Sequence, residues 1–185
     1  MLRITGGYLA GRAISSLPGE DTRPPLTRVR EAIANILRPC TEDATVLDLF
    51  AGTGSFSFEL LSRGAKSAVL IDKNPKAVQV LRKNASKLGV EHMVQIMRAD
   101  ALQMIEHFKR TGGRFDIVIV APPYFTGLDQ ESMDGLASGA LLSPGGIVVL
   151  QQARKEKFSD KYGALFLKKA YRYGDTRIST YIKDE

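Results

Sequence analysis

Apolar runs and helical spacing alternate from residue 45 to residue 150. Short, nearly continuous apolar runs predict strands at 46–50, 67–71, 93–97, 115–120 and 146–150. Apolar residues that recur every three or four positions predict helices at 55–63, 75–88, 101–109 and 129–141. Strands that are apolar on both faces and alternate with helices are typical of a mostly parallel sheet with helices on both sides.

The two ends of the chain depart from this alternation. The prolines in segment 21–25 predict a rigid linker, because proline fixes the backbone and disfavours helix before it. Thr27 is the expected N-cap of a helix that runs to Pro39. Turn residues between short β-type segments predict two hairpins, pairing 3–5 with 12–14 and 165–171 with 177–182.

The composition is that of a single globular domain. Of the 185 residues, 44% are hydrophobic and 25% are charged, which is enough apolar material for one core. No apolar run reaches the roughly 18 residues that span a bilayer, and the first residues lack the apolar centre of a signal peptide. The single cysteine, Cys40, cannot form an internal disulfide, so we expect a cytoplasmic protein. His92 and His107 have no metal-ligand spacing, so we expect no metal.

The net charge of +6 is concentrated at the ends of the chain. Residues 1–38 carry six arginines against three acids, and residues 151–185 carry nine basic residues against five acids. The middle, 39–150, is close to neutral. Basic ends around a neutral core suit a ligand-binding domain whose ends contact nucleic acid. The alternative is ordinary solvated surface charge.

A glycine turn follows the first strand of the alternating region. Asp48-Leu49-Phe50-Ala51-Gly52-Thr53-Gly54 lies between a predicted strand and a predicted helix, where glycines let the backbone approach a ligand closely. A dinucleotide fingerprint has a third glycine three residues later, and here that position is Ser57. The turn therefore favours a nucleoside without a pyrophosphate over a nicotinamide dinucleotide.

Candidate polar residues follow the next strands in the same way. Asp72 can accept hydrogen bonds from the two hydroxyls of a ribose, and Asp100 can accept one from the amine of an adenine. Taken alone, an Asp after a strand is most often a helix cap. Acids at successive strand ends behind a glycine turn are more specific and indicate a cofactor that contains adenosine. Ala121-Pro122-Pro123-Tyr124 follows the fourth strand.

These motifs together resemble those of class I S-adenosylmethionine-dependent methyltransferases. The x-Pro-Pro-Tyr element looks like that of enzymes that methylate exocyclic amines of bases. Segments near the start are similar to RsmD-type 16S ribosomal-RNA (guanine-N2) methyltransferases: Ile4-Thr5-Gly6-Gly7-Tyr8-Leu9-Ala10-Gly11-Arg12, Thr22-Arg23-Pro24 and Thr27-Arg28-Val29-Arg30-Glu31-Ala32. The resemblance covers nearly the whole chain and is weakest after about Gln151.

The resemblance implies a Rossmann-like α/β fold. Its seven-stranded, mostly parallel sheet would carry helices on both faces, an antiparallel C-terminal hairpin and a small N-terminal β-hairpin. We expect residues 1–25 to form an RNA-contacting hairpin and linker, and residues 26–185 the S-adenosylmethionine-binding methyltransferase domain. The expected partner is small-subunit rRNA, within an assembling ribosomal particle or free, and the expected oligomeric state is a monomer.

The resemblance also assigns roles to individual residues. The catalytic segment would be Ala121, Pro122, Pro123 and Tyr124, with Tyr124 stacking on the extruded base. The cofactor would be bound by Arg23, Pro24, Thr27, Asp48, Phe50, Ala51, Gly52, Thr53, Gly54, Asp72, Lys73, Asp100 and Ala101. Among these, Arg23, Pro24 and Thr27 would close the site near the methionine end. RNA would be contacted by Arg3, Tyr8, Arg12, Arg28 and Arg30.

Position 121 departs from the family, which has Asp or sometimes Asn before the two prolines. A side-chain oxygen there can accept an N–H of the guanine amine and aim its lone pair at the methyl group. Ala121 offers no such oxygen, and losing one positioned partner costs roughly 30- to 1000-fold in rate. Three explanations are open: another acceptor such as Asp129, a catalytically weakened or inactive RNA-binding protein, or an engineered alanine. A DNA methyltransferase is disfavoured because the chain has no room for a large target-recognition domain.

Overall fold

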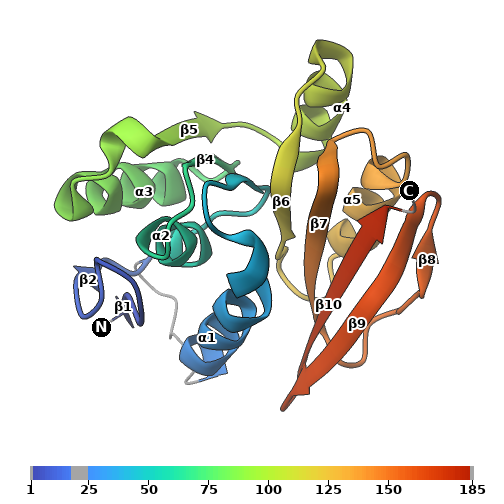
Figure 1. Cartoon of the computed structure of the whole chain (residues 1–185), viewed down its shortest axis with the longest axis horizontal. Coiled ribbons are helices and arrows are strands. Elements are labelled where there is room, and N and C mark those ends of the chain that lie inside the picture. Colours follow the sequence, from blue (N-terminus) through green and yellow to red (C-terminus); the bar gives the residue numbers. More distant parts are fainter. Residues whose placement is uncertain (1, 18–24, 184–185) are drawn as a thin grey trace.

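The computed structural model describes residues 2–17 and 25–183 of the chain (Figure 1). Its helices are α1 (Pro25–Leu37), α2 (Ser55–Ser62), α3 (Pro75–Leu88), α4 (Ala101–Thr111) and α5 (Leu128–Leu136), with short 3-10 helices at Arg38–Cys40 and Glu91–Met93. Its strands are β1 (Leu2–Arg3), β2 (Ala13–Ile14), β3 (Thr45–Asp48), β4 (Ser67–Asp72), β5 (Val94–Arg98), β6 (Phe115–Val120), β7 (Leu142–Ala153), β8 (Lys161–Tyr162), β9 (Leu165–Tyr173) and β10 (Thr176–Lys183).

The main sheet has eight strands in the order β5-β4-β3-β6-β7-β10-β9-β8. Strands β3 to β7 pair in parallel, and β10, β9 and β8 pair antiparallel. The order runs outward from β3 through β4 to β5 and then returns to β6 on the other side of β3. In open α/β sheets, ligands bind beyond the carboxyl ends of the strands at such a reversal. The expected mostly parallel sheet with an antiparallel C-terminal pair is confirmed.

Helices cover both faces of the sheet (Figure 1). One face packs α1, α2 and α3 against alternate strand residues such as Val46 and Ile117. The other packs α4 and α5 against the intervening residues, such as Leu47 and Val118. Because both sets are buried, each central strand is apolar at nearly every position, as the sequence pattern predicted.

The N-terminal hairpin packs beside α2 (Figure 1). Strands β1 and β2 pair through Leu2 with Ile14 and Arg3 with Ala13. The side chains of Ile4, Leu9 and Ile14 are buried in the same apolar cluster as α1, α2 and α3. The hairpin therefore shares the main core.

The structure differs from the sequence-based expectations at three places. Helix α1 begins at Pro25, because proline is favoured at the first helical position, so Thr27 lies inside the helix and is not its N-cap. Helix α5 ends at Leu136 instead of residue 141, because Gly139 turns the chain with φ +64°. Strand β7 starts at Leu142, four residues before the predicted start. The sheet contains one strand more than the seven expected, because the two-residue strand β8 adds to its edge.

None of the helices in the described parts of the chain is long and apolar enough to cross a membrane.

Candidate active site

A cavity of about 420 Å³ opens at the carboxyl ends of β3, β4, β5 and β6. This volume lies within the usual range for small-molecule sites. Its wall brings together residues from all four predicted strand-end motifs with residues from the N-terminal segment, α2, α3, α5 and β7. The lining residues are Leu2, Leu17, Leu49, Phe50, Ala51, Gly52, Thr53, Ser55, Phe56, Asp72, Lys73, Asn74, Ala77, Ala99, Asp100, Ala101, Ala121, Pro122, Pro123, Leu128 and Gln151.

The two glycines of the turn have different tasks. Gly52 has φ +54°, and a Cβ built on it would meet no atom within 4 Å, so the backbone there faces open space in the cavity wall. Gly54 has φ +77°, and a Cβ would lie 2.3 Å from the ring of Phe58 and 2.8 Å from Leu81. Gly54 does not line the cavity but lets α2 begin close against α3. The prediction that both glycines contact the cofactor therefore finds geometric support at Gly52 alone.

Asp72 ties the glycine turn to the end of β4. Its Oδ2 accepts a hydrogen bond from the Gly52 N–H at 2.9 Å, and its Oδ1 accepts one from the Asn74 N–H at 2.8 Å. A carboxylate has about four acceptor positions, so each oxygen keeps capacity for a ligand hydroxyl. Because Asp72 lines the cavity, it can hold the turn and the ribose of a nucleoside together.

Asp100 combines the cap role and the cavity position. Its Oδ1 accepts the N–H groups of Leu102 and Gln103 at 3.0 and 3.2 Å, which makes Asp100 the N-cap of α4. Its carboxylate also lines the cavity next to Ala101. The cap orients one oxygen toward the helix and leaves Oδ2 for a ligand amine.

Asp48 is not part of the cavity wall, contrary to its predicted role in direct cofactor contact. It is fully buried behind the turn, where its Oδ2 accepts the Ser57 hydroxyl at 2.8 Å. Burial raises the pKa of Asp48 to about 7, against the opposing effect of the Ser57 hydrogen bond. Asp48 therefore anchors α2 beneath the glycine turn.

The Pro-Pro-Tyr segment forms the opposite wall of the cavity. Ala121, Pro122 and Pro123 line it, while Tyr124 is turned toward the antiparallel part of the sheet. The Tyr124 hydroxyl lies 2.9 Å from Thr176 Oγ1 on β10 and accepts a hydrogen bond from Gln151 Nε2 at 3.1 Å. Tyr124 is thus fixed by two neighbouring strands.

Asp129 is excluded as the replacement acceptor in this arrangement. It is 3% exposed, and its Oδ2 accepts hydrogen bonds from Gln152 Nε2 at 2.6 Å and Gln130 Nε2 at 3.1 Å. Asp129 does not belong to the cavity wall. Proximity in sequence was misleading because α5 carries Asp129 under β7, on the side away from the cavity.

Phe125 is an exposed aromatic residue beside this segment that the motif did not predict. Its side chain is 70% exposed and its backbone has φ +60°, a strained conformation for a bulky residue. The carboxylate of Glu156 holds it there by accepting the Phe125 N–H, and also accepts the Ala153 N–H.

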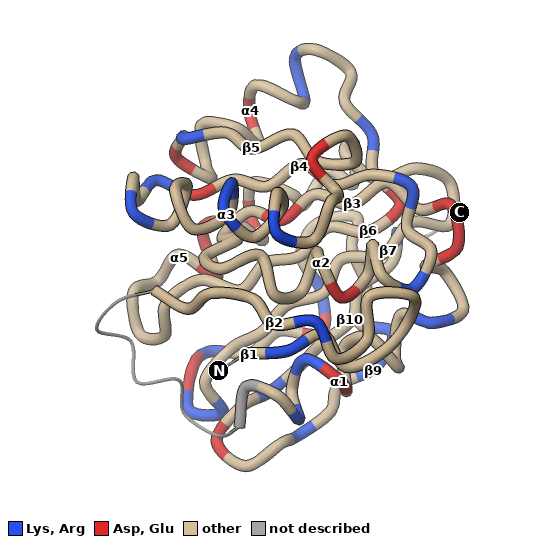
Figure 2. Tube along the Cα trace, turned by 90° about the vertical axis from the view of Figure 1, so that its left-hand side faces the viewer, with Lys and Arg blue, Asp and Glu red and all other residues tan. Residues whose placement is uncertain are grey.

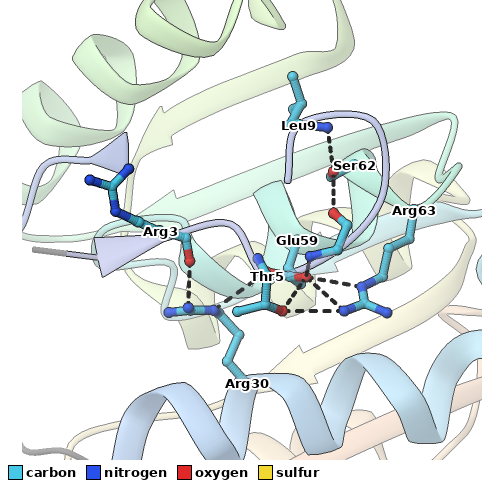
Figure 3. A network of polar contacts seen from close by, with 8 residues as sticks. Arg3, Thr5, Leu9, Arg30, Glu59, Ser62 and Arg63 are labelled. Atoms are coloured by element: carbon cyan, nitrogen blue, oxygen red, sulfur yellow. Dashed lines mark hydrogen bonds and ion pairs between the residues drawn. The ribbon is translucent and has the colours of Figure 1, made fainter. Parts of the chain in front are cut away.

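The structure contradicts the predicted RNA contact of Arg30. This arginine is 2% exposed and lies in a polar network between the hairpin, α1 and α2 (Figure 3). Its Nε lies 3.5 Å from Glu59 Oε2 and its Nη2 donates to the Arg3 carbonyl at 2.6 Å. Burial lowers the pKa of Arg30. The basic pattern of the sequence did not distinguish this structural arginine from exposed ones.

Glu59 is the centre of that network and was not predicted. It is 1% exposed and accepts hydrogen bonds from the Thr5 N–H, the Thr5 hydroxyl and the Gly6 N–H at 2.7–2.9 Å (Figure 3). Arg63 adds an ion pair at 2.9 Å. The hairpin is therefore attached to the helix that follows the glycine turn.

The other predicted RNA residues lie on the surface. Tyr8 is 65% exposed, and Arg28 is exposed on α1. Arg3 and Arg12 are exposed, but they also donate to the carbonyls of Gly11 and Leu88 at 2.7 and 2.9 Å. These four positions stay predictions.

Of the three residues predicted to close the methionine end, Thr27 lies in the described part of the chain. Arg23 and Pro24 lie outside the described residues. Thr27 is exposed at the start of α1 and is not part of the cavity wall as described.

The family model described as "Conserved hypothetical protein 95" matches residues 2–182. The Escherichia coli (strain K12) protein Ribosomal RNA small subunit methyltransferase D is 32% identical over 81% of this chain and 74% of its own length. YlbH of Bacillus subtilis, whose name proposes rRNA methylation, is 28% identical over 98% of this chain and 99% of its own length.

Solved structures agree with this match. The Escherichia coli protein named "Putative methyltransferase yhhF" superposes with a TM-score of 0.87 at 28% identity, over 99% of this chain and 98% of its own length. The fold and the cavity at its strand ends define a class I S-adenosylmethionine-dependent methyltransferase. Within that class, the chain belongs to the RsmD family.

Proposed function

We propose that this protein transfers the methyl group of S-adenosylmethionine to the exocyclic N2 of a guanine in 16S rRNA. The observation that carries the proposal is the single cavity that joins Gly52, Asp72 and Asp100 to the Pro122-Pro123 segment. The first three suit a nucleoside cofactor and the last suits a base amine. The rRNA substrate rests on the family relationship.

The cofactor side fits the shape and polarity of S-adenosylmethionine. Asp72 accepts from the ribose hydroxyls while it holds the Gly52 N–H. Asp100 Oδ2 accepts from the adenine amine beside Ala101, and the apolar wall of Leu49, Phe50 and Ala77 excludes water from the ring. Lys73 and Thr53 complete the polar rim.

On the acceptor side, the chain must orient a weak nucleophile. The lone pair of a guanine amine is delocalised into the ring, and acceptors of its N–H groups localise that pair. S-adenosylmethionine, held by Asp72 and Asp100, would supply an electrophilic sulfonium methyl; the amine nitrogen would gain the methyl and pass a proton to water, and the C–S electron pair would remain on sulfur. The backbone carbonyls of Ala121 and Pro122 are acceptors that this chain supplies whatever residue stands at 121.

The RNA would lie across the hairpin and α1, whose traces carry arginine positions (Figure 2). Arg3, Arg12 and Arg28 would contact phosphates there, and Tyr8 would stack on an unpaired base. A monomer acting on small-subunit rRNA, free or in an assembling particle, is part of the proposal. So is the role of residues 1–25 as the RNA-contacting unit.

The second candidate is a methyltransferase-fold protein that binds RNA without methylating it, and Ala121 favours it. The deciding experiment incubates this protein with labelled cofactor and rRNA from cells that lack the endogenous enzyme, and analyses the nucleosides by mass spectrometry. Labelled N2-methylguanosine supports the proposal. Binding of S-adenosylhomocysteine and of rRNA without label supports the second candidate. Failure to bind the cofactor contradicts the methyltransferase proposal, and failure to bind rRNA contradicts the second candidate.

A further inference from the structure

We propose that Gln151 supplies the side-chain oxygen that Ala121 lacks, by accepting an N–H of the guanine amine. The inference rests on the proposed function for its substrate class and deepens it. It concerns a residue 30 positions further along the chain that no sequence motif marks.

The register of the sheet places Gln151 beside Ala121. Strands β6 and β7 are parallel neighbours in which Val120, the last residue of β6, pairs with Leu150, so Ala121 and Gln151 are the residues that follow this pair. Side chains alternate between the two faces along a strand. Val120 and Leu150 pack in the α4–α5 cluster, so Ala121 and Gln151 both lie on the opposite face of the sheet.

Both residues line the same cavity. Adjacent strands are about 4.8 Å apart, and Gln has one methylene more than the Asp of the family. The longer side chain on the neighbouring strand can therefore bring an oxygen toward the space beside Ala121.

The amide of Gln151 is held at one end and unpaired at the other. Its Nε2 donates to the Tyr124 hydroxyl at 3.1 Å, and that hydroxyl is held by Thr176 at 2.9 Å. The residue is 8% exposed, and its Oε1 has no hydrogen-bond partner among the residues that the structure describes. A buried acceptor without a partner is unfavourable, and a ligand N–H removes that penalty.

Oε1 is covered by neighbouring atoms in this structure. The terminal torsion of a glutamine has a broad energy profile, so we expect a small rotation to present Oε1 as the base enters. Tyr124 contributes through its hydroxyl, which holds the amide of Gln151 from the side of β10.

A binding experiment tests the hydrogen bond without catalysis. Guanosine 5′-monophosphate and inosine 5′-monophosphate differ in the exocyclic amine, and their affinities are measured by NMR titration of the protein with S-adenosylhomocysteine bound. We expect the wild type to prefer guanosine about 2- to 10-fold, and Gln151→Leu to lose the preference while its affinity for inosine is unchanged. No preference in the wild type, or a preference that survives Gln151→Leu, overturns the inference.

A kinetic experiment tests the consequence. We expect Gln151→Leu to lower kcat roughly 30- to 1000-fold, with the KM for the cofactor unchanged, and Ala121→Asp in that background to restore at least about tenfold. Gln151→Glu keeps an acceptor and should retain more activity than Gln151→Leu. Gln95→Leu, the same change at an exposed position of β5, is the matched control and should leave kcat unaltered.

The two proposals fail in different ways. An active wild type whose kcat is unaffected by Gln151→Leu overturns the role of Gln151 and leaves the methyltransferase function in place. A wild type that prefers guanosine through Gln151 but transfers no methyl group overturns the function and leaves the hydrogen bond. Thermal unfolding of Gln151→Leu identifies a variant that has lost its fold. In that case Gln151→Met, which keeps the length of the side chain and removes the amide oxygen, carries the same binding and kinetic tests with the same expected losses.

Discussion

The cofactor side and the acceptor side of the cavity are built on different principles. On the cofactor side, Asp72 is the last residue of β4 and Asp100 comes two residues after the end of β5. Each is held by backbone N–H groups within three residues or by the glycine turn. On the acceptor side, Tyr124 is positioned by Gln151 and Thr176, which lie 27 and 52 residues away in sequence. Contacts between residues that are close in sequence thus position most of the cofactor side, and the pairing of distant strands positions the acceptor side.

The largest expected effect is on stability, through the Glu59 network that attaches the hairpin and α1 to α2 beneath the cofactor side. Glu59→Leu leaves the buried Arg30 without its partner and should lower the free energy of unfolding by about 3–5 kcal/mol. The control is Glu106→Leu, which removes an exposed pair with Lys109 and should cost about 1 kcal/mol or less. Urea unfolding gives both values. Equal losses would mean that the hairpin network does not support α2.

The protonation of Asp48, which lies behind the glycine turn on the cofactor side, should make the stability of the protein depend on pH. The folded pKa of about 7 lies above the ordinary value of 3.8, so the folded state binds the extra proton between these two values. Stability from this group is present at pH 4 and is lost as the pH rises to 7, by about 3 kcal/mol. Asp48→Asn cannot titrate, so unfolding curves from pH 4 to 8 should show a smaller decline for this variant. If the free energy of unfolding declined equally with pH in the wild type and in Asp48→Asn, Asp48 would be ionised throughout this range.

Removing the Asp72 carboxylate should weaken ligand binding on the cofactor side of the cavity and leave binding on the acceptor side unchanged. Asp72→Ala loses the hydrogen bond to Gly52 and the expected ribose contacts, so the Kd for S-adenosylhomocysteine should rise about 10- to 150-fold. Calorimetry measures this Kd, and Asp134→Ala, an exposed acid on α5, serves as the control. A comparable loss of affinity for guanosine 5′-monophosphate would mean that the halves are not independent.

The smallest effect is expected at Tyr124. Tyr124→Phe keeps the ring and removes the hydroxyl that joins Gln151 to Thr176, so kcat should fall about 2- to 10-fold with cofactor affinity unchanged. Methyl-transfer kinetics measure this, and Tyr173→Phe on β9 is the control. A change in the Kd for S-adenosylhomocysteine would place Tyr124 on the cofactor side instead.

Much of the fold follows from the sequence because its signals are local. The alternation of apolar runs with helical spacing identifies β3 to β7 and the helices between them, with ends that shift by a few residues. The helix at 129–141 was predicted too long because Ala137, Ala140 and Leu141 continue the helical spacing, while Gly139 turns the chain there. The edge strand β8 has two residues and no recognisable pattern.

By itself, the sequence determined that Gly52, Asp72 and Asp100 share one cavity: each lies at or just after the end of its own strand, and all parallel strands end at one edge of the sheet. The tertiary structure alone decided that Arg30 is buried with Glu59, that Asp48 lies behind the turn, and that Gln151 stands beside Ala121. These outcomes depend on which strands are neighbours and in which register. Those pairings join residues far apart in the chain and are set by packing of the whole core.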